Sequence, residues 1–206
     1  MNNINLYWWN SIPNFGDMLS PIVVEYLSGL KCKYSTNDKY KMISIGSILQ
    51  QHPIFDDDII WGSGARNEWK GLNYKKVDVK LIRGPKTRQI LLQHNINCPE
   101  KYCDPGVLAP FIYKIDYNKQ RKCDLLVVLH INTDCNIINF LIKNKIEYIT
   151  LRNNKDIVGI LDKISNSKVV ISNSLHAIIV SECMGIPTGY LQLPKNDNSF
   201  KSTWCI

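Results

Sequence analysis

The residues with the clearest chemistry lie in one short segment, Ser172-Asn173-Ser174-Leu175-His176. A β-branched run at 168–171 precedes it, and an apolar stretch that ends at Gly185 and Pro187 follows it. The segment is therefore predicted to join a buried strand to a helix. Serine and asparagine are N-cap residues, and the N–H groups of a helix's first turn bind phosphate or carboxylate. His176 would then stand beside an anion site, which suits group-transfer chemistry.

His176 is our first candidate for an acid–base residue, because an imidazole with a pKa of about 6.5 can either donate or accept a proton near neutral pH. The alternative is that it only hydrogen-bonds a backbone group of the turn. Ser172, Asn173 and Ser174 are expected to cap the helix. Capping and anion binding are compatible, because a cap occupies only part of the first turn's N–H groups.

Arg83 is predicted to end another strand, where its planar guanidinium could hold a phosphate or a carboxylate. The alternative is a structural ion pair. Lys86 and Arg88 lie on the helix that follows and are further phosphate candidates, although a solvated helix face would explain at least one of them. Gly62-Ser63-Gly64 would let a ligand approach the backbone closely, but a tight turn is the default reading of such a segment.

Strands and helices alternate along most of the chain, which predicts parallel sheets covered by helices. The expected helices begin after Ser20 (with Pro21 first and Gly29 as the stop), at Pro85, near Asn136, near Lys155 and after Ser174. The expected strands are 4–9, 42–45, 58–61, 77–82, 125–130, 147–151 and 168–171. A polar segment at 113–122 is read as a linker between two Rossmann-like domains, 1–112 and 123–206, that face a cleft. Ligands of such folds bind at the carboxyl ends of strands.

The composition of the 206-residue chain indicates an ordinary globular protein. It has no apolar run of about 18 residues and no signal-peptide pattern at its start, so we expect neither a membrane span nor export. The net charge of +7 comes from scattered lysines, and no nucleic-acid-binding motif is evident. Seven cysteines without a CxxC pair and without a secretion signal indicate a reducing compartment, the cytoplasm, and argue against a disulfide framework and a metal site. We expect no cofactor.

Five motifs in order resemble those of the polysaccharide pyruvyl transferases, and most closely the branch that decorates bacterial exopolysaccharides. Each motif is weak alone, but each follows a predicted strand or opens a predicted turn, and together they extend over most of the chain. They are Asn14-Phe15-Gly16-Asp17, Trp61-Gly62-Ser63-Gly64-Ala65, Arg83-Gly84-Pro85-Lys86-Thr87-Arg88, Asp104-Pro105-Gly106, and Ser172 to His176 with Gly185-Ile186-Pro187.

The resemblance implies a two-domain fold like that of the GT-B glycosyltransferases. It also implies phosphoenolpyruvate as the donor, and a nucleotide-linked or lipid-linked saccharide as the acceptor. Its product would be a pyruvate ketal bridging two sugar hydroxyls. Peripheral association with a membrane would follow from a lipid-linked acceptor. The sequence does not indicate an oligomeric state.

The chemistry of this transfer suggests roles for individual residues. Asp17 would be the base for the acceptor hydroxyl, with capping or bracing of the helix that begins near Ser20 as the alternative. The N-terminal domain would bind the acceptor and the C-terminal domain the donor phosphate. Many relatives carry arginine at the position of Ser174 and glycine at that of Ala177. The donor-side residues would be Arg83, Lys86, Arg88, Ser172, Asn173, Ser174 and Lys201, and the acceptor-side residues Asn14, Gly16, Gly62, Ser63, Gly64 and His130. The alternative for His130 is a buried, hydrogen-bonded histidine, and for Lys201 a disordered tail. Gly16 would supply either a positive φ or room for the substrate.

Two other functions fit the same architecture. One is a glycosyltransferase that uses a nucleotide sugar, although residues 123–206 leave little room for a base-binding pocket. The other is a truncated relative that binds carbohydrate or anions without catalysis. It is suggested by the chain's ending soon after Lys201, where family members continue into a further helical segment.

Overall fold

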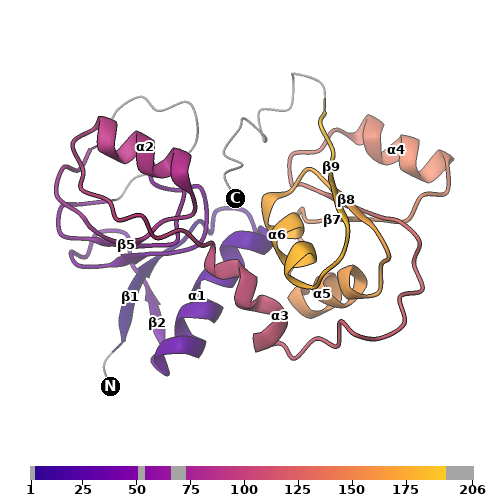
Figure 1. The fold of residues 1–206 in the computed structure, drawn as a ribbon, viewed down its shortest axis with the longest axis horizontal. Helices are drawn as coiled ribbons and strands as arrows, with labels where there is room; N and C mark the ends of the chain where they lie inside the picture. Colours follow the sequence, from indigo (N-terminus) through magenta and orange to yellow (C-terminus); the bar gives the residue numbers. More distant parts are fainter. Residues whose placement is uncertain (1–2, 51–53, 66–72, 194–206) are drawn as a thin grey trace. The chain divides into compact units, whose positions relative to one another are not determined.

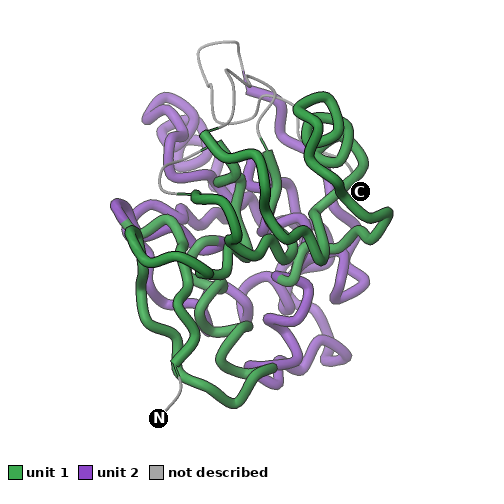
Figure 2. Tube along the Cα trace, turned by 90° about the vertical axis from the view of Figure 1, so that its left-hand side faces the viewer, with its two compact units in different colours: residues 1–10, 17–105, 201–206 green, residues 11–16, 106–200 purple. Residues whose placement is uncertain are grey.

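The computed structural model describes residues 3–50, 54–65 and 73–193. Figure 2 shows that these residues form two compact units. Unit 1 holds residues 3–10 and 17–105, and unit 2 holds residues 11–16 and 106–193. Because residues 11–16 belong to unit 2, that unit includes the segment leading into the first helix and the first two residues of that helix.

Five parallel strands form the sheet of unit 1, in the order β2-β1-β3-β4-β5. Figure 1 labels β1, β2 and β5 of this sheet. Four of them confirm predicted strands, in shorter form. The strand β2 was not predicted, because only three residues form it and two of them are exposed, so no apolar pattern marks it. The strands are β1 (Ile4–Tyr7), β2 (Cys32–Tyr34), β3 (Met42–Ile43), β4 (Ile59–Trp61) and β5 (Asp78–Leu81).

The first helix of unit 1 corrects a prediction. Helix α1 (Phe15–Ser28) begins six residues before Pro21, which lies in its interior. A proline there removes one helical hydrogen bond. Burial compensates for this loss, because Phe15 and Leu19 are fully buried. The second helix, α2 (Pro85–Gln93), starts at its proline as predicted.

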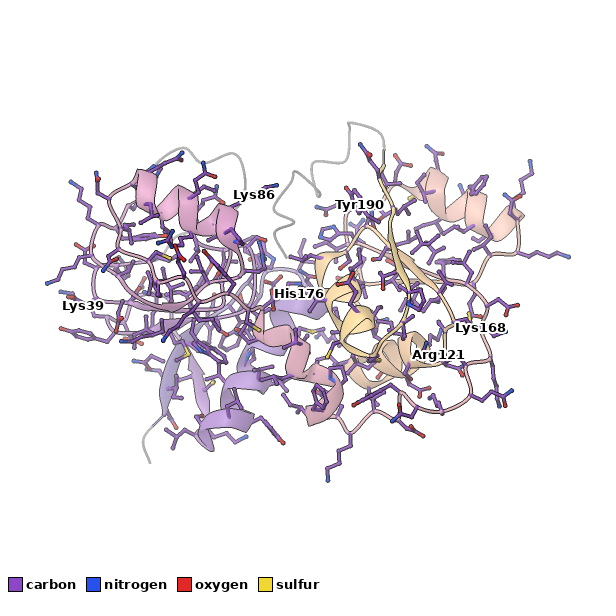
Figure 3. The ribbon with its side chains drawn as sticks, in the orientation of Figure 1. Lys39, Lys86, Arg121, Lys168, His176 and Tyr190 are labelled. Carbon is purple, nitrogen blue, oxygen red and sulfur yellow. The ribbon has the colours of Figure 1, made fainter. Side chains whose placement is uncertain are left out.

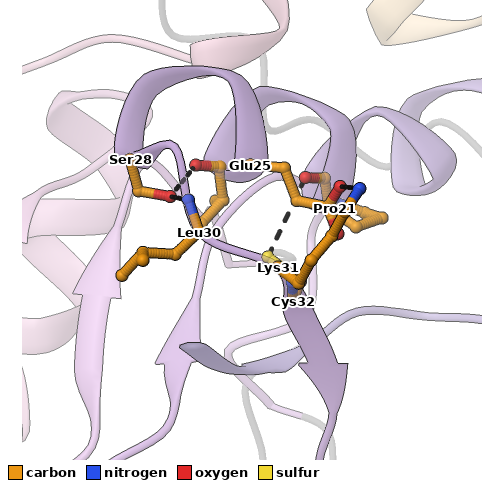
Figure 4. Close-up of polar contacts among 7 residues, drawn as sticks. Pro21, Glu25, Ser28, Leu30, Lys31 and Cys32 are labelled. Atoms are coloured by element: carbon orange, nitrogen blue, oxygen red, sulfur yellow. Dashed lines mark hydrogen bonds and ion pairs between the residues drawn. The ribbon is translucent and has the colours of Figure 1, made fainter. Parts of the chain in front are cut away.

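The end of α1 is tied to β2 by Glu25 (Figure 4). Its carboxylate accepts hydrogen bonds from the Cys32 backbone N–H at 2.9 Å and from Lys31 Nζ at 2.8 Å. The bond from Lys31 is the main cause that lowers the Glu25 pKa below its usual value. Ser28 also accepts a bond from the Leu30 N–H at 3.1 Å. These contacts fix the turn that brings Cys32 beside Ile4 in the sheet.

The core of unit 1 contains an ion pair at the amino ends of its strands. Lys41 precedes β3 and Asp58 precedes β4, and both side chains are fully buried with Nζ and Oδ2 2.5 Å apart. Asp58 also accepts the backbone N–H groups of Lys41 and Phe55, and the Lys41 ammonium lies 4.4 Å from the centre of the Phe55 ring. A buried pair is tolerated when its remaining polar atoms are satisfied in this way.

Unit 2 has a sheet of four parallel strands in the order β7-β6-β8-β9. Three strands confirm predictions, whereas β9 and the short helix α3 were not predicted. The helices α4 and α5 are capped by Asp134 and Asp156, whose carboxylates accept backbone N–H bonds. The elements are α3 (Ala109–Ile112), β6 (Leu126–Leu129), α4 (Cys135–Lys143), β7 (Tyr148–Thr150), α5 (Ile157–Ser165), β8 (Val170–Ser172), α6 (Leu175–Cys183) and β9 (Thr188–Tyr190).

The segment 113–122 has neither helix nor strand, and all of it is described as part of unit 2. Arg121 anchors its end, because the guanidinium donates to the backbone carbonyls of Met184 and Gly185 just after α6. The chain is thus an α/β protein with two parallel sheets. In its described part, no helix has the length and apolar character needed to cross a membrane.

Candidate functional site

Both sheets contain a point where the strand order reverses. In unit 1 this point lies between β1 and β3, and in unit 2 between β6 and β8. The loops that leave the carboxyl ends of two such strands diverge, and open α/β sheets bind ligands there. Most of the predicted site residues follow these strands or their neighbours, so each sheet is considered in turn.

The turns after β3 and β4 in unit 1 are joined through Gly46. Its carbonyl accepts hydrogen bonds from the Gly64 N–H at 2.9 Å and from the Ser63 hydroxyl at 2.9 Å. Gly46 and Gly62 have φ values of +121° and +91°, which favour glycine. Ser63 is fully buried, so its hydroxyl serves this turn. A role of Gly62, Ser63 and Gly64 in acceptor binding stays a prediction.

Arg83 lies just after β5, at the same end of the sheet. It is 6% exposed, and its Nη2 donates to the Ser47 hydroxyl at 2.9 Å. Its backbone N–H donates to the Ser63 carbonyl. The guanidinium packs against Gly64, where a Cβ atom would overlap it. The turns after three strands therefore hold the orientation of Arg83.

The two basic residues on α2 differ in their surroundings. Lys86 is exposed (Figure 3). Arg88 is half-buried and donates to the Cys98 carbonyl at 3.1 Å, and it pairs with Glu100 at 3.1 Å. These contacts give Arg88 a structural role in unit 1. Binding of the donor by either residue stays a prediction.

Asp17 lies in the first turn of α1, where the helix dipole favours a carboxylate. It does not cap a helix beginning near Ser20, because α1 starts at Phe15. Asp17 is 6% exposed, and its Oδ1 lies 2.6 Å from where a Cβ of Gly46 would be. The pKa of Tyr7, at the end of β1, is raised by three causes. Burial is the largest, followed by the interaction with Tyr34 and then by the charge of Asp17. Asn14 directly precedes α1 and is half-buried.

The turn between β8 and α6 in unit 2 is held by side chains. The Ser172 hydroxyl donates to the Val128 carbonyl at 2.7 Å and accepts the Ser174 N–H at 2.9 Å. Ser174, within the described part of unit 2, stands at the N-cap position of α6. Its hydroxyl makes no capping hydrogen bond. The prediction of a serine cap is wrong in this respect. The hydroxyl at the N-cap therefore leaves the first-turn N–H groups for other partners.

Asn173 links the turns that follow β6 and β8. Its side chain is 1% exposed, accepts the His130 N–H at 2.7 Å and donates to the Thr133 hydroxyl at 3.0 Å. Thr133 in turn donates to the His130 carbonyl at 2.8 Å. The network spans the reversal of strand order in this sheet. Asn173 thus shapes the site, and direct contact with a phosphate stays a prediction.

His130 directly follows β6 and is half-buried within this network. Its Nδ1 lies 3.3 Å from the Asn132 backbone N–H and accepts a hydrogen bond from it. A ring nitrogen that accepts carries no proton, so the neutral ring holds its proton on Nε2. His130 is therefore arranged as an Nε2–H donor.

His176 lies in the first turn of α6 (Figure 3) and is 7% exposed. Its ring packs against the backbone of Gly16, which belongs to the same unit. The atoms nearest to the Cβ position of Gly16 are Nδ1, Cγ and Cε1 of the ring. His176, Ser172, Asn173, Ser174 and His130 thus belong to one end of the unit 2 sheet, as the strand-end rule predicts.

Three residues of these turns were missed by the sequence prediction. Gly46 carries the carbonyl that joins two turns, Ser47 accepts the hydrogen bond from Arg83, and Thr133 completes the Asn173 network. The Gly46-Ser47 pair after a strand was the available signal for the first two. A threonine among polar loop residues gave none. Lys201, predicted on the donor side, lies outside the described residues.

Residues 14–191 match the family model of the polysaccharide pyruvyl transferases. The match begins at Asn14 and ends just after β9, so it includes every predicted site residue except Lys201. No curated protein and no solved structure matches the chain.

Proposed function

The chain belongs to the polysaccharide pyruvyl transferase family and is a transferase, and from this premise we propose that it moves pyruvate from phosphoenolpyruvate to two hydroxyls of a saccharide. The observation that carries the proposal is the family match over residues 14–191. The contacts within each unit support it, because the residues that the chemistry needs are buried at the carboxyl ends of strands.

The proposed reaction consumes one phosphoenolpyruvate and releases one phosphate. A proton is added to the methylene carbon, which becomes the methyl group of the product, and an oxocarbenium-like centre develops at the neighbouring carbon. One sugar hydroxyl attacks that carbon and loses its proton. The carbon–oxygen bond to phosphate breaks, and phosphate leaves with the bonding pair and takes up one of the released protons. The second hydroxyl attacks, loses its proton and completes the ketal.

The donor carries a phosphate and a carboxylate, so its site needs cations and N–H donors. In unit 2 we assign this role to the N-terminal turn of α6, where the Ser174 hydroxyl does not act as a cap. In unit 1 we assign it to Arg83, whose guanidinium is oriented by Ser47. Lys86, Arg88 and Lys201 are secondary candidates.

Two residues are assigned to proton transfer. His176 delivers the proton to the methylene carbon, because an imidazole can donate or accept a proton near neutral pH. Asp17 accepts the proton of the attacking hydroxyl. Its burial in the first turn of α1 fits a base that works away from bulk water.

We assign the acceptor saccharide to Asn14, Gly16, Gly62, Ser63, Gly64 and His130. The Nε2–H of His130 would donate to a sugar or phosphate oxygen, because its Nδ1 is occupied by Asn132. A lipid-linked acceptor would bring the protein to a membrane surface, whereas a nucleotide-linked one would not. The absence of a paired cysteine pattern in the sequence supports the cytoplasm as the compartment.

The proposal is tested by phosphate release in the presence of phosphoenolpyruvate and candidate saccharides. His176→Ala should abolish the release, because both the imidazole and its acid–base function are lost. His94→Ala is the matched control: that ring lies 3.0 Å from the Ile90 carbonyl at the end of α2, and its removal should leave the release unchanged. Release that persists in His176→Ala would remove His176 from the mechanism.

A thermal-shift comparison separates the proposal from the other two functions. A ligand that binds only the folded state raises the melting temperature. Phosphoenolpyruvate should raise it and nucleotide sugars should not. A shift with nucleotide sugars alone would favour a glycosyltransferase, and a shift with phosphoenolpyruvate without phosphate release from any acceptor would favour a binding protein.

A further inference from the structure

Gly16 occupies a position where the backbone gives no reason for glycine. It is the second residue of α1, and its φ lies outside the positive region that favours glycine. Alanine is more favourable than glycine inside a helix. Some other constraint must therefore explain the residue.

The space beside Gly16 supplies that constraint. The three atoms nearest to a Cβ built there are Nδ1, Cγ and Cε1 of His176, all of which it would overlap. The Nδ1 side of the ring thus faces Gly16, and Nε2 lies on the far side of the ring. The imidazole of His176 occupies the space that a side chain at position 16 would need.

Gly64 repeats the arrangement in unit 1. Its φ is also outside the positive region, and its Cβ would overlap Nη2, Cζ and Nε of Arg83. The Nη2 atom that lies over Gly64 also donates to Ser47. The glycine and the serine hydroxyl therefore fix the guanidinium from two directions.

Other glycines show that such a contact is not general. Gly46 and Gly62 have positive φ values that account for glycine by themselves. Gly189 in β9 has only an ordinary contact, 3.4 Å from its Cβ position to Ile171. Gly159 in α5 faces the carboxylate of Asp156, but that carboxylate caps the same helix and lies one turn away along the chain.

We propose that Gly16 and Gly64 are positioning residues for the transfer reaction. Gly16 fixes the His176 ring so that Nε2 is the atom that exchanges the proton, and Gly64 fixes the guanidinium of Arg83. This inference rests on the proposed function for its kinetic consequences. Its structural part, the dependence of each side chain on its glycine, stands apart from any activity.

A double-mutant cycle tests the structural part. Gly16→Ala should lower the melting temperature in the wild-type background, because the methyl group displaces the ring. In the His176→Ala background the same substitution should raise it, since the space is then vacant and alanine favours the helix. Gly64→Ala should show the same dependence on Arg83→Ala. Equal effects of each glycine substitution in both backgrounds would overturn the proposal.

Nuclear magnetic resonance of the imidazoles gives a readout that does not require activity. In protein labelled at its four histidines, the His176 signal is identified by its loss in His176→Asn. Gly16→Ala should shift that signal, because the added methyl group displaces the ring. Gly159→Ala and Gly189→Ala, the matched controls, should leave it in place. An unshifted His176 signal in folded Gly16→Ala would refute the inference.

Kinetics of phosphate release test the functional part. Gly16→Ala should lower kcat at least tenfold and alter the pH profile, because the acid–base group moves. Gly64→Ala should instead raise KM for phosphoenolpyruvate at least tenfold and leave the pH profile unchanged, because Arg83 binds rather than transfers protons. Normal kinetics in both variants would contradict the positioning roles. If the wild-type protein releases no phosphate with any acceptor, the proposed function fails, while the cycle and the imidazole signal still decide the structural part.

Discussion

The turns at the carboxyl ends of the two sheets share a topology, but different atoms hold them. In unit 1 the contacts run largely between backbone groups, and in unit 2 they run through side chains. Because the strands β1, β2, β3 and β4 have the same order as β6, β7, β8 and β9, the comparison isolates the turns from the fold.

The turns of unit 1 depend on glycine. Gly46 and Gly62 adopt positive φ values, and the Gly46 carbonyl accepts both the Gly64 N–H and the Ser63 hydroxyl. Close backbone approach leaves room for large buried side chains, and Arg83 and Asp17 occupy the Cβ sides of Gly64 and Gly46. Glycine thus sets both the path of the chain and the place of the charges.

The turns of unit 2 depend on hydroxyl and amide groups. Ser172 bonds the Val128 carbonyl, and Asn173 bonds both His130 and Thr133. Such a network specifies one arrangement when every member is satisfied. The difference indicates that the turns after β3 and β4 in unit 1 are sensitive to added side-chain atoms, and the turns after β6 and β8 in unit 2 to removed ones.

The largest expected effect comes from adding one methyl group to a turn of unit 1. Gly62→Ala should lower the free energy of unfolding by about 3 kcal/mol, because alanine is strained at a φ of +91° and its Cβ would overlap the Pro105 ring. Chemical denaturation measures it. Gly189→Ala in unit 2 is the control and should be near neutral. A loss in Gly189→Ala as large as that in Gly62→Ala would remove the contrast between the units.

A smaller effect is expected from deleting a side chain in unit 2. Asn173→Ala should lower the free energy of unfolding by about 2 kcal/mol, since the His130 N–H loses its acceptor in a partly buried place. Ser63→Ala in unit 1 should cost about 1 kcal/mol or less, because the Gly46 carbonyl keeps its bond from the Gly64 N–H. Denaturation of the two variants under the same conditions gives the difference. Equal costs would show that unit 1 relies on side chains as much as unit 2 does.

The same contrast explains how much of the fold was predictable. Buried strands such as β6, with four apolar residues, and helices with an aspartate cap, such as α4, have local signals. The start of α1 has a misleading one: Pro21 usually marks a first turn, but the burial of Phe15 extends the helix beyond it. The strands β2 and β9 have three residues each and gain their pairing from neighbours, which the sequence does not reveal.

The candidate site was predictable only in part, for a similar reason. The strand-end rule and the family motifs located Arg83, His176 and the glycines. The contacts that orient them join residues far apart in the chain, as Gly16 and His176 do, and no local pattern encodes such a pair. The turn after β8 was predictable from the local sequence and accounts for the position of Asn173. No local pattern indicates its hydrogen-bond partner Thr133, which is 40 residues away.

The smallest expected difference between the units concerns a buried thiol. Cys98 in unit 1 is 2% exposed, and burial raises its pKa from an ordinary value near 9 to about 11, while Arg88 opposes the rise slightly. The unfolded chain therefore loses this proton before the folded one does. The stability that the neutral thiol contributes is fully present below about pH 9 and is lost as the pH rises toward 11.

Unfolding measured from pH 8.5 to 11 in the wild type and in Cys98→Ala isolates this thiol, because other groups titrate equally in both. The stability difference between the two proteins should narrow across the interval. Cys183→Ala in unit 2, whose thiol pKa burial also raises, should show a weaker narrowing because that side chain is only half-buried. A difference that stays constant with pH for Cys98→Ala would mean that the thiol ionises as readily in the folded unit as in the unfolded chain.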